Sequence, residues 1–573
     1  MDELNPPLAE PSAEFDAVVI GAGFAGMYML VRLRRLGLRT RVVEAGGGVG
    51  GTWYWNRYPG ARCDVESLQY CYSFDEALQQ EWVWTERYPQ QAEILRYIDH
   101  VADRFDLRRD IDLNTRVTQA HYDETSQRWA VRTDTGRQLR ARLLISAAGC
   151  LSAARVPDIP GLDSFKGRQY HTGHWPHEPV DFTGQRVGVV GTGSSGIQAI
   201  PVIARQAKQL VVFQRTPNFS IPAWNRPLPL TEQQAWKAHY AEHRARARNT
   251  RSGILYEYST RSAMSISEEE REREYEARWA RGGANFTHAF NDIYTHKPSN
   301  DTASEFVRRK IRGIVSDPKR AALLAPTDHA IGTKRICVDS DYYATFNLPH
   351  VDLVDLKTTP IERIVPEGIQ TSEGTHPLDA IVFATGYDAV TGALDRIDIR
   401  GLGGRTLKEH WAEGASTYLG LMCAGFPNFF LITGPASPSV LTNVIVAIEQ
   451  HVDWIARLLA HMQARGQLTA QAEPAAEAQW MKHAHEVASA TLHASTNSWY
   501  TGANIPGKPR TLLPYIGGLD KYTAICEEIA AAGYRGFAFD PTTAPTPPAA
   551  ALAAADPPAT LNARASTGIT ETR

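Results

Sequence analysis

Two glycine-rich loops, each between an apolar strand pattern and an apolar helix pattern, constrain the fold more than any other feature of the sequence. The first is Gly21-Ala22-Gly23-Phe24-Ala25-Gly26, and the second is Gly191-Thr192-Gly193-Ser194-Ser195-Gly196. In such a context the glycines of G-x-G-x-x-G let the backbone approach a pyrophosphate, and the helix N-terminus supplies partial positive charge. One loop alone is weak evidence, but two predict an α/β fold with two Rossmann-like dinucleotide-binding domains.

The residues that end the next strand in each unit differ in charge. Strand 40–43 is followed by Glu44, at the distance expected of a group that hydrogen-bonds an adenosine ribose. Strand 209–214 is followed by Arg215-Thr216, and an arginine there suits the 2′-phosphate of NADP. The two units are therefore predicted to bind two different dinucleotides.

Length, charge and cysteine usage exclude several classes of protein. A chain of 573 residues is too long for one hydrophobic core, and a formal net charge of -3 argues against nucleic acid as a partner. The six cysteines form no C-x-x-C pair, so neither a disulfide framework nor a metal site is expected. The N-terminus does not have the pattern of a signal peptide, and we expect a cytoplasmic protein.

The stretch 415–448 carries no charged residue, although several prolines and glycines interrupt it. A lipid-exposed segment could not satisfy the backbone groups that these residues leave free. We therefore expect no membrane association, and interpret the stretch as buried core that also lines a pocket.

The expected domain organisation places a helical insertion inside the second dinucleotide unit. Its charged runs 244–248 and 267–274 are interpreted as solvated helix faces, and the second run starts like a capping box. The division is a disordered lead at 1–14, the FAD-binding domain at 15–150 and 378–540, the NADP-binding domain at 151–225 and 326–377, the helical insertion at 226–325 and a disordered tail at 541–573.

Between the two units, the spacing of Phe165, Gly167, His171 and Trp175-Pro176 resembles the fingerprint of type I Baeyer–Villiger monooxygenases. His177 stands where the family usually has aspartate. The similarity extends from about 15 to 539 and is greatest to the phenylacetone and steroid monooxygenase branch. The further matches are at 57–64, 332–335 and 497–500.

The resemblance implies an enzyme that uses FAD, NADPH and dioxygen to convert ketones to esters or lactones through a flavin C4a-peroxide. It implies a catalytic role for Arg335, a cation that cannot lose its proton, with Asp64 as its partner. It gives His171 a positioning role that links domains. The residues expected to bind the two cofactors are Gly21, Gly23, Gly26, Glu44, Gly51, Thr52, Trp53, Trp55, Arg62, Asp64, Tyr70, Val117, Gly191, Thr192, Gly193, Ser194, Ser195, Gly196, Arg215, Thr216, Lys334 and Trp499.

Two other functions share the glycine loops. One is a flavin monooxygenase that oxygenates sulfur or nitrogen, and the other is a non-catalytic flavin-binding sensor. A disulfide reductase is disfavoured because no C-x-x-C exists for the thiol relay. The sequence leaves the physiological ketone open, although residues 437–441 are expected to border its pocket. It also leaves the oligomeric state open, with a monomer favoured.

Overall fold

The computed structural model describes residues 13–541, and its first sheet has the strand order β17-β4-β5-β6-β1-β2-β3, with β18 paired to β6. Parallel pairing of β1 with β2 and β6 places the first glycine loop at the carboxyl edge, and β4–β6 form an antiparallel extension. The strands are β1 (Ala13–Ile20), β2 (Thr40–Val43), β3 (Ile111–Asp112), β4 (Val117–Asp123), β5 (Arg128–Thr133), β6 (Gln138–Ser146), β17 (Asp398–Arg400) and β18 (Phe429–Leu431).

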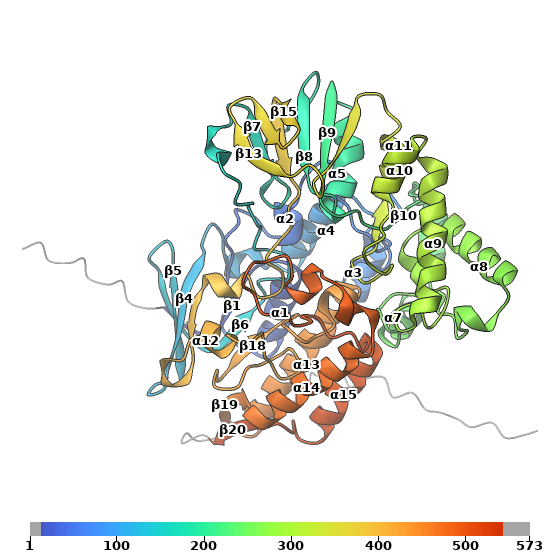
Figure 1. The fold of residues 1–573 in the computed structure, drawn as a ribbon. Helices are drawn as coiled ribbons and strands as arrows, with labels where there is room; N and C mark the ends of the chain where they lie inside the picture. Colours follow the sequence, from blue (N-terminus) through green and yellow to red (C-terminus); the bar gives the residue numbers. More distant parts are fainter. Residues whose placement is uncertain (1–12, 542–573) are drawn as a thin grey trace, which may run out of the picture.

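The second sheet has the order β12-β9-β8-β16-β7, and all its pairings are parallel. It lies beside α5, at the top of the view in Figure 1. Together with the first sheet it confirms the predicted α/β fold with two dinucleotide-binding units. Its strands are β7 (Arg168–His171), β8 (Arg186–Val190), β9 (Gln209–Gln214), β12 (Val351–Asp355) and β16 (Ala380–Phe383).

Smaller strand pairs complete the described part of the chain. They are β10 (Ser220–Pro222) with β11 (Cys337–Asp339), the three strands β13 (Ile361–Val365), β14 (Gly368–Thr371) and β15 (Gly374–Pro377), and β19 (Gln467–Ala472) with β20 (Phe537–Pro541).

One helix follows each glycine loop, α1 in the first unit and α5 in the second. The first helix, α1, packs against the long helix α13 below the first sheet (Figure 1). Outside the insertion the helices are α1 (Phe24–Arg35), α2 (Thr52–Trp55), α3 (Glu76–Glu81), α4 (Gln91–Arg104), α5 (Ser194–Ala204), α11 (Tyr342–Thr345), α12 (Leu407–His410), α13 (Val444–Ala464), α14 (Pro474–Ser489) and α15 (Leu519–Ala531).

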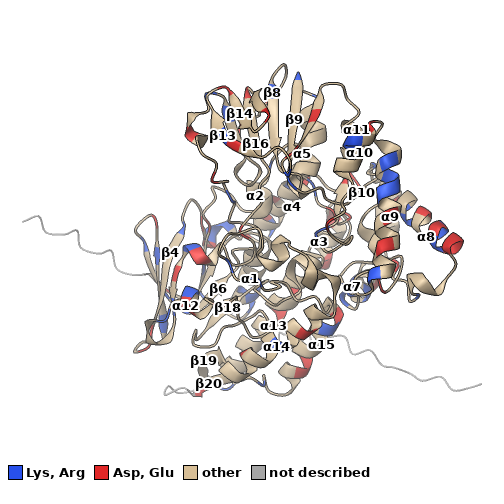
Figure 2. Cartoon of the chain, viewed as in Figure 1, with Lys and Arg blue, Asp and Glu red and all other residues tan. Residues whose placement is uncertain are grey.

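Residues 230–324 contain five α-helices, two short 3-10 helices and no strand, on the right in Figure 1. The α-helices are α6 (Leu230–Lys237), α7 (Tyr240–Arg248), α8 (Glu268–Arg281), α9 (Lys297–Ile314) and α10 (Pro318–Leu324). Ser267 caps α8 by accepting from the backbone N–H of Glu270, as the charged run predicts. Figure 2 shows both signs of charge on α8 and α9, where Arg309 pairs with Glu272 and Lys310 with Glu276.

Three boundaries differ from those expected from the sequence. β1 begins at Ala13, inside the expected lead, because residues 13–15 pair with β6. β20 ends at Pro541, the first residue of the expected tail. β16 pairs with β7 and β8, so the chain leaves the second sheet after Phe383 rather than at 378. The remainder of the expected lead and tail lies outside the described residues.

The charge-free stretch is almost entirely buried, as predicted. Its strand β18 joins the first sheet by pairing with β6 through Phe429, Phe430 and Leu431. All three residues are buried, and a buried segment cannot readily hold a charge, which accounts for the missing charges. Among residues 13–541, no helix combines the length and apolarity that a membrane crossing needs.

Candidate functional site

A cavity of about 1150 Å³ lies at the carboxyl ends of the parallel strands in both sheets. Its walls include the residues that follow β1 and β2 in the first sheet and those that follow β8 and β9 in the second. The carboxyl edge is where open α/β sheets bind ligands. The volume exceeds the roughly 300–1,000 Å³ of most small-molecule pockets, as two dinucleotides require.

Both predicted catalytic residues and most predicted cofactor residues line this cavity. They are Gly21, Gly23, Glu44, Gly51, Thr52, Trp53, Trp55, Arg62, Asp64, Tyr70, Val117, Gly191, Thr192, Gly193, Ser194, Ser195, Arg215, Thr216, Lys334, Arg335 and Trp499. Gly26, Gly196 and the four fingerprint residues do not line it. Arg62 also forms an ion pair with Glu86, at 3.0 Å between Nη1 and Oε2.

The glycines of the two loops have different physical roles. A Cβ on Gly26 would lie 1.8 Å from the carbonyl oxygen of Gly21, and one on Gly196 would lie 2.2 Å from that of Gly191. These third glycines therefore allow the helix to pack on its own loop. Gly193 faces open space, because a Cβ on it would have no atom within 4 Å, and this leaves room for a ligand beside the backbone.

The helices that follow the loops begin without a capping side chain. The N-cap residues are Gly23 for α1 and Gly193 for α5, and neither helix has an acidic residue in its first turn. The first N–H groups of such a helix need an acceptor, and a pyrophosphate provides one. Both helix starts thus fit the phosphates of a dinucleotide.

Glu44 is buried and holds the first loop in shape. Its carboxylate accepts from the backbone N–H of Ala22 and of Gly46, each at 2.7 Å. Burial raises its pKa above the ordinary value, although these two hydrogen bonds oppose the shift. The carboxylate lines the cavity, where it can also accept from a ribose hydroxyl.

The aromatic segment predicted to contact a planar ring forms the short helix α2. Trp53 lies in the cavity wall and donates from Nε1 to the hydroxyl of Tyr70 at 3.1 Å. The two rings meet edge to face, with centroids 5.9 Å apart. This hydrogen bond fixes the plane of the indole in the cavity wall.

Arg215 and Lys334 are two cations in the second half of the cavity. Burial lowers the pKa of Lys334, and the positive charge of Arg215 contributes to the shift, so the two groups lie near one another. Neither takes part in an ion pair within residues 13–541. Thr192 donates to the backbone carbonyl of Thr216 at 2.9 Å and joins the glycine loop to this strand end. The pair suits a dianionic phosphate.

Arg335 and Asp64 form a two-point ion pair in the cavity wall. Nε of Arg335 donates to one carboxylate oxygen of Asp64 at 2.9 Å, and Nη2 donates to the other at 2.7 Å. Nη1 donates to the backbone carbonyl of Val440 at 2.8 Å. The negative charge of Asp64 raises the pKa of Arg335 further above its ordinary range.

A second cavity, of about 130 Å³, adjoins the first, and Asp64 and Arg335 line both. Val440 and Leu441 border it, as expected of the segment 437–441. Loops of the helical insertion provide much of the remaining wall. The aromatic and imidazole side chains around it are Tyr256, His288, Tyr294, His493, Tyr500 and Tyr515.

The fingerprint residues lie beside the first cavity and link chain segments. His171 accepts from the backbone N–H of Gly173 at 3.0 Å, and its other ring nitrogen contacts the carbonyl of Arg155 at 3.0 Å. Burial lowers its pKa, which favours the neutral ring. A Cβ on Gly167 would lie 2.5 Å from the carbonyl oxygen of Asp379, so only glycine fits there. Trp175 stacks on Tyr170, with centroids 5.1 Å apart.

Two groups of residues at the site were not predicted from the sequence. Gln198 of α5 accepts from the hydroxyl of Tyr58 at 2.8 Å and donates to the carbonyl of Arg62 at 3.0 Å, so it ties the second unit to the first. The sequence signal that could have identified Gln198 is its position as the one amide side chain in the mostly apolar helix α5. The insertion loops that line the second cavity carry no comparable sequence signal, because the charged residues of the neighbouring helices dominate the composition of this region.

His410, Cys423 and Glu477 lie together away from both cavities, with ligand atoms within 4.8 Å of one another. Glu477 already accepts from the hydroxyl of Ser416 at 2.7 Å and from the backbone N–H of Ala424 at 2.6 Å. These bonds account for the buried carboxylate without an ion.

Comparisons with known proteins agree with this geometry. The model of the pyridine nucleotide-disulphide oxidoreductase family matches residues 18–251. The chain is 43% identical to a Baeyer-Villiger monooxygenase of Pseudooceanicola batsensis, over 92% of this chain and 97% of that protein. It is 43% identical to the phenazine N-monooxygenase PhzNO1 of Lysobacter antibioticus, over 91% and 96%.

Solved structures are also similar to most of the chain. An oxidized steroid monooxygenase bound to NADP is 53% identical, with a TM-score of 0.89, over 92% of this chain and 99% of that one. A complex of OTEMO with FAD and NADP is 41% identical, with a TM-score of 0.90, over 92% and 100%.

Proposed function

The chain belongs to the family of type I Baeyer–Villiger monooxygenases, and we propose that it oxidises its ketone at the Arg335–Asp64 pair, between the two cavities. It is an FAD- and NADPH-dependent enzyme, as the sequence predicts. We further propose that it uses dioxygen, acts as a monomer and is located in the cytoplasm. The class of ketone and the role of each site residue are proposed below.

The main support for this proposal is that two N–H groups of the Arg335 guanidinium are left for a ligand. A guanidinium has five N–H bonds, and three of them are used by Asp64 and Val440. One N–H on Nη1 and one on Nη2 have no partner within residues 13–541. Because the guanidinium keeps its proton at any working pH, it presents two fixed donors and a positive charge to an oxygen that gains negative charge.

The remaining residues bind and orient the two cofactors. When bound, FAD and NADPH supply the redox chemistry of the reaction. The helix starts at Phe24 and Ser194 hold the two pyrophosphates, and Arg215 with Lys334 holds the 2′-phosphate of NADPH. Trp53 and Tyr70 form the wall against the flavin ring. Trp499, in the same cavity, covers the nicotinamide side and helps to exclude water.

The second cavity supports a ketone with one ring next to its carbonyl group. Its 130 Å³ is close to the roughly 150 Å³ of an apolar protein cavity that binds benzene. Its aromatic walls suit the faces and edges of such a ring. Four fused rings exceed this volume, so we place a one-ring ketone ahead of a steroid.

One relative supports a second candidate function, the oxygenation of an aromatic nitrogen. The phenazine N-monooxygenase of Lysobacter antibioticus is as similar to this chain as the Baeyer-Villiger monooxygenase of Pseudooceanicola batsensis. The same free N–H donors can stabilise an oxygen transferred to nitrogen.

A substrate panel with NADPH and dioxygen separates the two. It contains an arylacetone, a cycloalkanone, a steroidal ketone and phenazine, and the products are identified by mass. We expect ester or lactone from the one-ring ketones. N-oxide without any ester would favour the second candidate, and no substrate-dependent NADPH oxidation would contradict both.

A further inference from the structure

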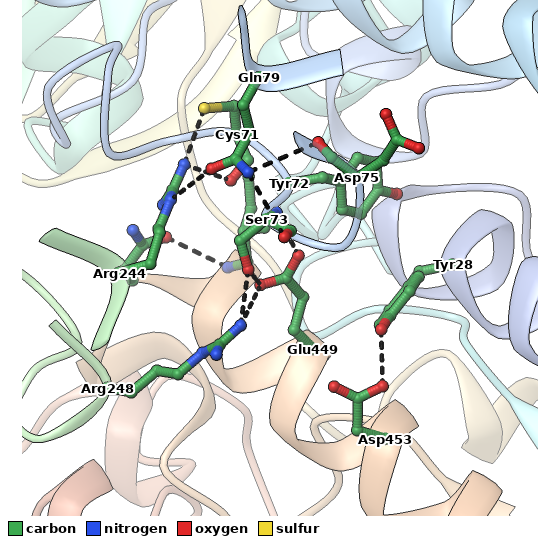
Figure 3. A network of polar contacts seen from close by, with 12 residues as sticks. Tyr28, Cys71, Tyr72, Ser73, Asp75, Gln79, Arg244, Arg248, Glu449 and Asp453 are labelled. Atoms are coloured by element: carbon green, nitrogen blue, oxygen red, sulfur yellow. Dashed lines mark hydrogen bonds and ion pairs between the residues drawn. The ribbon is translucent and has the colours of Figure 1, made fainter. Parts of the chain in front are cut away.

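Arg244, in helix α7 of the insertion, holds the turn at residues 68–71 of the first dinucleotide unit. Its Nη1 donates to the carbonyl of Gln69 at 3.0 Å, and its Nη2 donates to the carbonyl of Cys71 at 3.0 Å and contacts the sulfur at 2.9 Å. Figure 3 shows the guanidinium directed into this turn. One buried side chain thus joins two segments far apart in the sequence.

Arg244 is buried, so the expectation of a solvated helix face over 244–248 is wrong at this residue. Arg244 is only 7% exposed and forms no ion pair within residues 13–541. An unpaired buried charge is costly unless its N–H groups are satisfied, and here backbone carbonyls and the amide oxygen of Gln79 accept them. The turn is therefore shaped around the guanidinium.

The end of the same turn is fixed by Glu449 of α13. Its carboxylate accepts from both the backbone N–H and the hydroxyl of Ser73 (Figure 3). Arg248 lies 3.9 Å from this carboxylate. The insertion and α13 together leave the turn little freedom.

The opposite side of the turn faces the large cavity. Tyr70 lines that cavity and accepts the hydrogen bond from Nε1 of Trp53. The carbonyl of Gln69 also accepts from the side chain of Asn443, which caps α13, and Val444 and Ile448 of that helix line the cavity. Because Arg244 binds the carbonyls on both sides of Tyr70, its position determines where Tyr70 lies in the cavity wall.

We propose that Arg244 is a positioning residue for the flavin site. It fixes the backbone on either side of Tyr70, and the Tyr70 hydroxyl then sets the plane of Trp53 against the flavin. The insertion therefore completes the wall of a cofactor site formed mainly by the first unit. This inference rests on the proposed placement of FAD against Trp53.

A double-mutant cycle on FAD binding tests this role. The variants are Arg244→Gln, Tyr70→Phe and their combination, with Arg246→Gln as the matched control on an exposed face of the same helix. The dissociation constant of FAD is measured by titrating apoprotein, and the melting temperature of each apoprotein is recorded. We expect each single variant to weaken FAD binding about tenfold, the value of one hydrogen bond to a charged or well-placed group.

The double variant distinguishes positioning from a structural role. If Arg244 acts through Tyr70, the dissociation constant of FAD in the double variant should be about equal to the larger of the two single-variant values. The drop in melting temperature on Arg244→Gln should be the same with or without Tyr70→Phe. Arg244 donates to backbone carbonyls and not to the Tyr70 hydroxyl, so Tyr70→Phe leaves its hydrogen bonds in place. Effects on FAD binding that multiply would overturn the inference.

Arg244→Lys provides a second variant if Arg244→Gln does not fold. It retains one charged donor for the turn, and an intermediate dissociation constant is expected. A dissociation constant equal to that of the parent for every Arg244 variant would also refute the role. Failure of the parent to form ester, with the cycle unchanged, would contradict the proposed reaction only.

Discussion

The guanidinium of Arg335 and the carboxylate of Asp64 face one another through two parallel hydrogen bonds, at 2.9 and 2.7 Å. They come from segments 271 positions apart, and the pair lines both cavities. A two-point contact fixes the plane of the guanidinium as well as its distance. The free N–H bonds on Nη1 and Nη2 are therefore aimed by Asp64.

Replacing Arg335 should separate cofactor binding from oxygen transfer. We expect Arg335→Ala to keep bound FAD and some NADPH oxidation but to lose ester formation by about 10²–10³-fold, the cost of removing one fixed donor at a developing charge. Product analysis alongside NADPH consumption measures both. Arg335→Lys, which keeps the charge without the fork, should recover only part of the rate. Ester formed by purified Arg335→Ala at the parent rate would refute the assignment.

Arg215, which follows β9, should discriminate between NADPH and NADH. Arg215→Ala removes one of the two cations proposed for the 2′-phosphate, and we expect the KM for NADPH to rise about 10–100-fold, as for a lost charge-assisted hydrogen bond. The KM for NADH, which lacks that phosphate, should change little.

Steady-state kinetics with both cofactors provide the comparison. Arg205→Ala, an exposed arginine just after α5, serves as the control and should alter neither KM. Equal changes for NADPH and NADH in Arg215→Ala would remove that residue from the phosphate site.

The second glycine loop allows a contrast between function and folding. Gly193→Ala should leave the melting temperature nearly unchanged because a Cβ meets no atom within 4 Å, yet it should weaken NADPH binding by occupying space beside the pyrophosphate. Gly196→Ala should lower the melting temperature, because its Cβ would overlap the carbonyl of Gly191. Calorimetry of both apoproteins and NADPH titration test the pair. Unchanged NADPH affinity in Gly193→Ala would show that the cofactor lies elsewhere.

Local patterns made the fold predictable. Each glycine loop is continuous in sequence with its strand and helix, so the strand–loop–helix units that begin α1 and α5 could be predicted from residues 15–36 and 187–203 alone. The charge-free stretch predicted burial because a buried strand such as β18 cannot readily hold a charge. The family resemblance located Arg335, which no local pattern distinguishes from a surface arginine.

Long-range contacts limited the rest. β16 joins the second sheet through pairing with β7, more than 200 positions earlier, and no local signal gives that register. The second cavity forms where loops of the insertion meet residues 440–442 and 493–518, so no local pattern predicts its full lining. Gln198 acts across a unit boundary and was missed for the same reason. The expectation that Arg244 lies on a solvated helix face was wrong because its acceptors come from residues 69–71, far away in the sequence.

Acid should destabilise the protein partly through His451. This residue is fully buried, its Nδ1 accepts from the backbone N–H of Thr433 at 3.0 Å, and its Nε2 has no partner within residues 13–541. Burial lowers its pKa to about 3, whereas an exposed histidine has a pKa of about 6.5. Below pH 6.5 the unfolded chain therefore binds a proton that the folded chain does not.

Because of this difference, the free energy of unfolding decreases by about 1.4 kcal/mol for each unit by which the pH is lowered between 6.5 and 3, counting this group alone. His451→Gln keeps an acceptor for the N–H of Thr433 but cannot take up the proton, so its unfolding free energy should fall less steeply. Urea titrations at pH 7, 6 and 5 measure the slopes. His239→Gln, a substitution of the same kind at an exposed position, is the matched control. An identical slope for His451→Gln and the parent would mean that His451 is already accessible to protons in the folded state.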